Sequence, residues 1–424
     1  MPLKHCLTAA LILTASRCVL GSGDIQPDDL RAFATPFESH EPDQFVFLDE
    51  CAKAVRIIGI GESTHGTADF TELPQKLLAH LAAECGYNTL IIESMAGEVA
   101  YLNDYALGKR DDLDRILAEI NSSWRYRTTQ FVGLVNWIRA HNKTHNDNPI
   151  EIHGMEMQYV RADGERLRDY LQLVGFQLDV PDIEQHLWQQ VSRDQHLEWF
   201  TQLQSVFRAF DTNRESWIST QGRDAYWNAH HHAEVMQQFL LTIAQPRGQR
   251  KHDLRDIYMA ENVEWIMWKR GEGSKAVVWA HNSHIADGVD NGTVDVLGHQ
   301  LRKRFGESYF AIATVFGTGS YYAFPPDADE AGWTLELYDR KAIQADTFTA
   351  VLETLGNPNV FVDFRAVRAG SASLNCDLNA PMKIMSGAGA QRYPTATRLY
   401  DLGSKFDAVI YLDETSPIEW MATE

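Results

Sequence analysis

The segment Arg56-Ile57-Ile58-Gly59-Ile60-Gly61-Glu62-Ser63-Thr64-His65-Gly66 runs from an apolar stretch directly into polar side chains. Its β-branched residues predict a buried strand, and its glycines let the backbone approach a ligand closely. Histidine titrates near neutral pH, so His65 can take a proton from water if a carboxylate such as Glu62 orients its ring. A tight strand-to-helix turn capped by Ser63 or Thr64 explains the same residues, and the segment alone leaves both interpretations open.

Comparable apolar runs recur along the chain, with helical patterns between them. They are Thr89–Ile92, Ile150–His153, Ala276–Trp279, Tyr309–Phe316, Asn359–Phe364 and Phe406–Leu412. Near-continuous apolar strands of this length are typical of a parallel sheet that helices cover on both faces. The sequence therefore predicts an α/β fold with a mostly parallel central sheet flanked by helices.

Ionisable side chains follow the ends of several predicted strands. Glu93 follows the second run of the chain and Glu156 the third, while His281 and His284 follow the fourth. Ligands of open α/β sheets bind outside the carboxyl ends of the strands, so we expect these side chains to meet His65 at one edge. The two glutamates either pair with arginine or act as tuned bases. The two later histidines suit either metal ligation or hydrogen bonding to an oxyanion.

The pattern changes between about residues 161 and 269, where no strand-like run occurs. Helical patterns at Asp182–Arg208 and Asp211–Ala244 predict a long helical insertion, which we expect to cover the active edge as a lid. Arg255 and Glu261 lie in the last helix of this region. They either hold that helix to the sheet by ion pairing or bind substrate.

Two groups of ring-bearing side chains in this region are predicted to have no role in binding or catalysis. Four tryptophans are expected to pack helix on helix, namely Trp188, Trp199, Trp217 and Trp227. His230, His231 and His232 are adjacent in a helix and point about 100° apart, so they are predicted to form a solvated face rather than one ligand site.

The composition limits the classes of partner. The 424 residues allow one large domain or two ordinary ones. Lys and Arg number 38 against 58 Asp and Glu, which gives a formal charge of −20. Such a surface repels phosphate backbones and anionic lipids, so the sequence predicts a small-molecule partner, with no nucleic acid and no membrane. The five cysteines are scattered and include no C-x-x-C pair, which argues against a disulfide framework or a zinc knuckle.

The first 23 residues are read either as a signal peptide or as a disordered N-terminus, because a basic start precedes an apolar run from Cys6 to Ser16. The protein is accordingly expected in the cytoplasm, or secreted if residues 1–21 are a signal peptide. Residues 24–424 are expected to form one domain that includes the helical insertion. No later stretch reaches the roughly 18–20 apolar residues that a membrane-spanning helix needs.

Several familiar catalytic motifs are missing. The sequence has no G-x-S-x-G elbow, no H-E-x-x-H helix and no Walker loop. Thr64 stands where a G-x-G-x-x-G fingerprint requires its third glycine. A hydrolase built from these residues is therefore expected to use water, not serine, as its nucleophile.

The whole set of motifs resembles the erythromycin esterase family over roughly residues 30–415. The resemblance rests on Gly61–Gly66, the strand ending at Glu93, Arg255–Asn262, Val278–His284, Leu297-Gly298, Phe305–Tyr309, Phe316–Ser320 and Phe406–Ile410. It implies an esterase without metal or other cofactor that opens macrolactone rings by adding water, as in macrolide antibiotic resistance. It also implies that residues 24–424 form the catalytic domain. Members often have an arginine in the helix after the histidine motif, where this chain has Pro74.

The leading hypothesis is an ester or lactone hydrolase. The resemblance implies that His65 is the general base and that Glu62, Glu93, His281 and His284 line the same cleft. In our hypothesis, Glu62 or Glu93 orients His65 and balances its charge. His281 and His284 are assigned to the oxyanion or the leaving alkoxide. Substrate binding is assigned to Glu156, Arg255 and Glu261.

Two rival hypotheses remain open from the residues themselves. A metal-dependent hydrolase would use Glu62, His65, His281 and His284 as ligands. A non-catalytic protein would hold a large hydrophobic ligand or haem beneath the helical insertion. The true substrate and the oligomeric state are not predicted.

Overall fold

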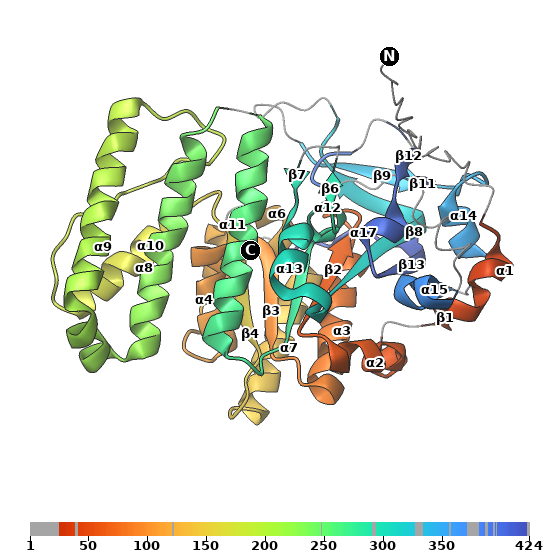
Figure 1. The fold of residues 1–424 in the computed structure, drawn as a ribbon, viewed down its shortest axis with the longest axis horizontal. Coiled ribbons are helices and arrows are strands. Elements are labelled where there is room, and N and C mark those ends of the chain that lie inside the picture. The colour runs from red at the N-terminus through yellow and green to blue at the C-terminus, as the bar shows by residue number, and fades with distance from the viewer. Residues whose placement is uncertain are drawn as a thin grey trace, which may run out of the picture.

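The computed structural model describes residues 25–38, 41–120, 123–246, 248–290, 294–326, 334–355, 358–370, 381–385, 389–392, 395 and 397–421 (Figure 1). Residues 1–23, predicted to be either a signal peptide or a disordered N-terminus, lie outside these residues. A mixed α/β architecture is built around one nine-stranded sheet. Its strands are β1 (Ala34–Phe37), β2 (Ile57–Glu62), β3 (Thr89–Met95), β4 (Glu151–Glu156), β5 (Ala276–His281), β8 (Tyr309–Ala323), β9 (Glu336–Arg340), β10 (Asn359–Asp363) and β13 (Ala408–Thr415).

The strand order is β1-β10-β13-β8-β2-β5-β3-β4, and β9 pairs with β8. All pairs from β13 to β4 are parallel, whereas the pairs of β10 with β1 and β13, and of β9 with β8, are antiparallel. The predicted fold, a mostly parallel sheet flanked by helices, is confirmed. Each of the seven apolar runs of the sequence forms a strand of this sheet.

Helices cover both faces of the sheet, and others lie beyond one of its edges. They are α1 (Pro27–Leu30), α2 (Asp49–Ala54), α3 (Asp69–Cys85), α4 (Ala96–Ala106), α5 (Leu113–Glu119), α6 (Ser123–Tyr126), α7 (Thr129–Thr144), α8 (Arg161–Leu173), α9 (Arg193–Gln221), α10 (Arg223–Ile243), α11 (Gln249–Arg270), α12 (Asn282–Ile285), α13 (Leu297–Phe305), α14 (Phe348–Glu353), α15 (Phe364–Gly370) and α17 (Leu402–Lys405). Short 3₁₀ turns occupy Arg31–Phe33, Pro42–Leu48 and Gly306–Ser308, and two small hairpins pair β6 (Val289–Asp290) with β7 (Val294–Asp295) and β11 (Met382–Met385) with β12 (Thr397–Tyr400).

The period-two alternation of the strands divides the core into two layers. Ile58 and Ile60 of β2 face one layer, which α3, α4, α5 and α7 complete. Ile57 of the same strand faces the other layer, which α11, α13, α14 and α15 complete. Both layers exclude water, so the parallel strands are apolar along most of their length and become polar only at their ends.

The helices α8, α9 and α10 form a third core of their own. Figure 1 shows them at one end of the molecule, beyond the β4 edge of the sheet, and not above the strand ends as the predicted lid would be. The predicted helix Asp182–Arg208 is also wrong at its start, because α9 begins at Arg193, where Ser192 caps it. The break to α10 comes at Gly222, whose φ of +87° favours glycine. The last helix of the region, α11, packs on the sheet.

Of the two predictions about aromatic and histidine rings in this region, one is confirmed and one is wrong. All four tryptophans pack in or against the third core, as expected. The solvated face predicted for the histidine triplet is wrong, because α8 and α11 flank α10. His232 Nδ1 lies 2.8 Å from Asp163 Oδ1, and the His231 ring stacks on Trp265 with centroids 3.7 Å apart. None of the helices in the described ranges combines the length and apolar character needed to cross a bilayer.

Arg270, at the end of α11, fastens this helix to the starts of two strands. Its guanidinium pairs with Glu151 and donates to the carbonyl oxygens of Asn88 and Pro149, both at 3.1 Å. Burial alone would raise the pKa of Glu151, but a hydrogen bond from His153 and the charges of His153 and Arg270 lower it to about 2. The folded state therefore binds a proton at this carboxylate less readily than the unfolded chain does.

We expect Glu151→Gln to lower the free energy of unfolding at pH 7 by up to roughly 3 kcal/mol, which is the energy equivalent of the pKa shift. Because the folded pKa is depressed, the contribution is fully present above the unfolded value near 4.3 and is lost as the pH falls toward 2. Urea unfolding of both proteins between pH 7 and pH 3 measures the difference. A difference that does not shrink on acidification would contradict the assignment.

Candidate active site

Four neighbouring strands deliver buried polar side chains to one edge of the sheet. Glu62 ends β2 and pairs in register with His281, which ends β5. Glu93 lies near the end of β3, and Glu156 ends β4. The four strands lie side by side in the order β2-β5-β3-β4, and they are parallel. The sheet therefore brings together these four residues, as the sequence predicted.

Glu62 organises the first part of the site. Its Oε1 accepts hydrogen bonds from His65 Nδ1 and, at 2.8 Å, from Arg125 Nη2. Its Oε2 accepts from Trp279 Nε1 at 3.1 Å. Because a carboxylate can only accept, the His65 proton sits on Nδ1 and the lone pair of Nε2 is left for a ligand.

The free ring nitrogen of His65 and that of His281 face the same small space. The two ring centroids are 5.6 Å apart. A Cβ atom placed on Gly389 would lie 3.8 Å from His65 Nε2 and 3.6 Å from His281 Nε2. Trp124 lies edge-on to the His65 ring at 6.4 Å and edge-on to Phe324 at 5.6 Å. A single reacting group in this space is thus within reach of both imidazoles and beside an aromatic wall.

His281 is held in one tautomer. Its Nδ1 accepts from the backbone N–H of Ser283 at 3.2 Å and lies 2.7 Å from the Ser283 hydroxyl. The ring proton is therefore on Nε2, which points to the shared space. Burial, and next the charge of His65, hold the pKa of His281 well below its usual range. The ring is a neutral hydrogen-bond donor at neutral pH.

Glu93 anchors His281 from behind. Its Oε2 accepts the backbone N–H of His281 at 2.9 Å, and its Oε1 accepts from Arg255 Nη2 at 2.8 Å. Burial would raise the pKa of Glu93, but the positive charges of His284 and Arg255 outweigh burial and hold the pKa well below its ordinary value. Glu93 is therefore an ionised structural partner of its neighbours at any moderate pH.

Arg255 bridges Glu93 to Glu156. Its Nε donates to Glu156 Oε1 at 2.6 Å, and its Nη1 lies 2.9 Å from His284 Nε2. The other nitrogen of His284 lies 2.6 Å from Asp256 Oδ1, so both ring nitrogens of His284 are engaged. Among the described residues Glu156 Oε2 has no hydrogen-bond partner, and burial raises the Glu156 pKa. These contacts fix the Arg255 guanidinium and the His284 ring beside the Glu93 carboxylate.

One predicted residue lies elsewhere. Glu261 is exposed, and the charges that act on it are Arg304, Glu264 and Glu234. Six residues after Arg255 on the same helix correspond to about 240° of rotation, which carries Glu261 to another face of α11. The structure therefore corrects the prediction that Glu261 belongs to the site.

Three residues of the site were not predicted from the sequence. Arg125 follows no motif and reaches Glu62 from the short helix α6, and Trp279 had been taken only as part of a strand. Gly389 lies on a segment without any pattern. Pro74 lies buried inside α3, so the positive charge at Glu62 comes from Arg125 instead of the helix after the histidine motif.

The charges around these residues oppose a metal ion. Ligand atoms of Glu62, His65 and Glu93 do lie within 4.8 Å of one another. However, Glu62 Oε1 accepts from Arg125 and Glu93 Oε1 from Arg255, both at 2.8 Å, so two guanidinium groups hold the oxygens that a cation would need. The positive charge of these arginines opposes a second cation.

The fold and the site define an α/β protein with a buried histidine–carboxylate centre at the carboxyl edge of its sheet. The family model of erythromycin esterases matches residues 82–415, and the chain belongs to this family. It is therefore a hydrolase of the erythromycin-esterase kind.

Relatives agree with this placement. The chain is 22% identical over 422 residues to erythromycin esterase type II of Escherichia coli, covering 91% of this chain and 96% of the relative. A solved Bacillus cereus protein superimposes with a TM-score of 0.79 at 19% identity, covering 93% of this chain and 98% of the other. A mutant of the erythromycin esterase EreC in its open conformation gives 0.65 at 16% identity, with 90% and 98% covered. These structures show the shared fold.

The space shared by the two imidazoles generates a prediction. Gly389→Ala would place a methyl carbon there, and the backbone at Gly389 is not left-handed, so alanine adds no strain. We expect kcat/KM for ester hydrolysis to fall about 100-fold, because a reacting group displaced by about 1 Å loses that much. Gly133→Ala is the matched control, since nothing lies within 4 Å of its added carbon. Equal kinetics of the two variants would mean that Gly389 does not border the reacting space.

Proposed function

We propose that this chain hydrolyses a carboxylic ester or lactone with water that His65 activates. The observation that carries the proposal is the convergence of His65 Nε2 and His281 Nε2 on one space, with Glu62 behind His65. One nitrogen has a lone pair and the other a proton, which is the pairing that water addition to a carbonyl needs. The membership of the chain in the erythromycin esterase family supports the same reaction class.

The reaction has two steps. His65 Nε2 takes a proton from water as the water oxygen bonds to the carbonyl carbon, and the carbonyl oxygen becomes an oxyanion. His281 Nε2–H donates a hydrogen bond to that oxyanion. The intermediate then collapses, the bond to the alkoxide oxygen breaks, and the His65 proton passes to the alkoxide. The products are a carboxylic acid and an alcohol, or one hydroxy acid from a lactone.

The partners of the two histidines have distinct tasks in this scheme. Glu62 stabilises the His65 imidazolium by direct contact, and Arg125 and Trp279 fix the Glu62 carboxylate. Glu93 fixes the backbone of His281. We assign His284 to positioning, together with Arg255 and Glu156, since its ring nitrogens are engaged by neighbouring side chains.

The substrate class follows from the surroundings and the relatives. Trp124 lies beside the His65 ring and packs against Phe324, which favours an ester with an apolar body. The Escherichia coli relative is named for erythromycin, a macrolide, so macrolactones are the first substrates to test. We propose residues 24–424 as the catalytic domain.

His65→Ala is expected to lower kcat for ester or macrolactone opening by about 10²–10⁴, the contribution of a positioned general base. Hydrolysis is followed by mass spectrometry as the gain of one water per substrate. The control is His145→Ala, because His145 is exposed at the end of α7. Circular dichroism confirms that both variants fold. Activity of His65→Ala within about tenfold of the parent would exclude His65 as the base.

Metal removal separates this proposal from a metallohydrolase. Because guanidinium groups hold the carboxylate oxygens of the site, we expect dialysis against a strong chelator to leave kcat unchanged within twofold. Elemental analysis of the active protein supplies the second readout. A stoichiometric ion whose removal abolishes turnover and whose return restores it would establish the metal-dependent alternative.

A further inference from the structure

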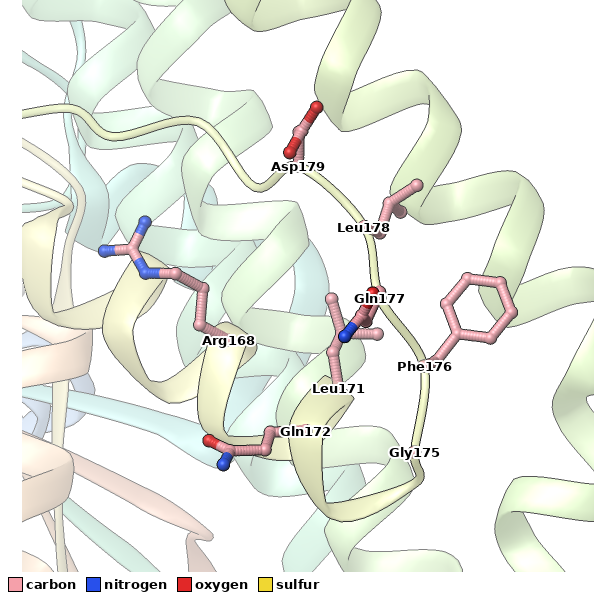
Figure 2. A pocket seen from close by; sticks show the side chains of 8 residues that line it. All are labelled: Arg168, Leu171, Gln172, Gly175, Phe176, Gln177, Leu178 and Asp179. Carbon is pink, nitrogen blue, oxygen red and sulfur yellow. The ribbon is translucent and has the colours of Figure 1, made fainter.

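Several cavities lie away from His65, and two of them lie beside the helices α8 and α10. One, of about 610 Å³, opens where α8 ends, and Figure 2 shows Arg168 and Gln172 of α8 beside the following loop from Gly175 to Asp179. Arg168 already pairs with Asp182 at 3.3 Å. Asp179, the other charged residue of this lining, is exposed to water, so this cavity has no buried charge for a ligand to neutralise among its described residues.

The second cavity, of about 320 Å³, lies between the free edge of β4 and the helices α4, α10 and α11. Its lining is charged and polar along β4 and the helices, with apolar contributions from Ala96, Ala100, Leu107, Trp265 and Ile266. None of its lining residues belongs to the site around His65. Figure 1 shows α10 and α11 next to each other on this side of the sheet.

One cation of this cavity lacks a counter-ion. Arg270 pairs with Glu151, and Arg166 pairs with Asp104 at 2.6 Å. Within the described part of the chain no carboxylate lies within ion-pair distance of Lys269, whose ammonium is 5.7 Å from the Trp265 ring. Burial lowers the Lys269 pKa and outweighs the more distant negative charges of Glu151 and Asp224.

The remaining acid of the lining does not replace that counter-ion. Asp224 is exposed to solvent at the start of α10, where water and salt screen its charge. An anion from outside is therefore the partner that Lys269 fits, even though the protein as a whole is acidic.

Two histidines of the cavity add hydrogen-bond acceptors. His231 Nδ1 lies 3.2 Å from Glu234 Oε2, and His232 Nδ1 lies 2.8 Å from Asp163 Oδ1. Because each carboxylate accepts a proton from Nδ1, the opposite nitrogen of each ring has a free lone pair. Such nitrogens accept hydrogen bonds from hydroxyl groups. Burial lowers the His231 pKa, which keeps that ring neutral.

We propose that this cavity binds a small hydroxylated organic anion. Its anionic group pairs with the Lys269 ammonium, and its hydroxyl groups donate to His231 and His232. The site is separate from the hydrolytic centre and does not depend on the proposed reaction.

Isothermal titration calorimetry of the full chain with three probes of six carbons tests both parts of the ligand. Gluconate has the charge and the hydroxyl groups, hexanoate has only the charge, and sorbitol has only the hydroxyl groups. We expect gluconate to bind one site per chain at least tenfold more tightly than either of the others. The absence of saturable gluconate binding, or equal affinity for hexanoate, would overturn the proposal.

Variants locate the binding. Lys269→Met should weaken gluconate about 10-fold to 100-fold, the loss expected for one charge-assisted contact, whereas Lys269→Arg should retain binding. Lys143→Met is the matched control, since Lys143 is exposed on α7. His65→Ala should bind gluconate like the parent. Equal binding by both methionine variants, or loss of binding with His65→Ala, would place gluconate elsewhere and refute the site.

Discussion

The structure depends on how it neutralises three carboxylates at one edge of a parallel sheet. Glu62, Glu93 and Glu156 lie at or near the carboxyl ends of β2, β3 and β4 and are buried, so their charges would repel one another without partners. Arg125 contacts the first, and Arg255 bridges the other two at 2.8 and 2.6 Å. The two arginines also occupy carboxylate oxygens at this edge, whereas the Nε2 atoms of His65 and His281 face the shared space.

The geometry of the His65 loop rests on segments remote in the sequence. Gly66 pairs with Tyr322 of β8, and its carbonyl oxygen accepts from Ile418 N–H at 3.2 Å. An added Cβ at Gly66 would lie 1.9 Å from the Tyr322 carbonyl oxygen, so only glycine permits this contact. Trp420 Nε1 donates to the Trp124 carbonyl at 2.9 Å and ties the same end of the chain to the helix of Arg125. The C-terminal segment thus braces both halves of the Glu62 site.

The sequence predicts the site residues that lie at strand ends. It does not predict the residues that reach the site from segments distant in the sequence. The apolar runs specify the strands, and a parallel sheet brings Glu62, Glu93 and His281 to one edge by topology alone. Arg125 was invisible because a four-residue helix after α5 has no periodic pattern, and Gly389 because its role is a close approach across the fold. Glu261 was misplaced because the prediction did not consider the helical rotation that separates it from Arg255.

The helix α11 connects the two parts of the molecule that we assign to ligands. Arg255 near its start belongs to the hydrolytic site, and Lys269 near its end lines the second cavity. Fourteen residues separate them, or about 21 Å along the axis. The helix is fixed at one end by Glu93 and Glu156 and at the other by the contacts of Arg270 with Glu151 and two backbone carbonyls. Communication between two sites requires an element that can adopt two arrangements. A helix that is fixed at both ends is expected to keep a single arrangement. We therefore expect a ligand in the second cavity to stabilise the folded state without switching hydrolysis.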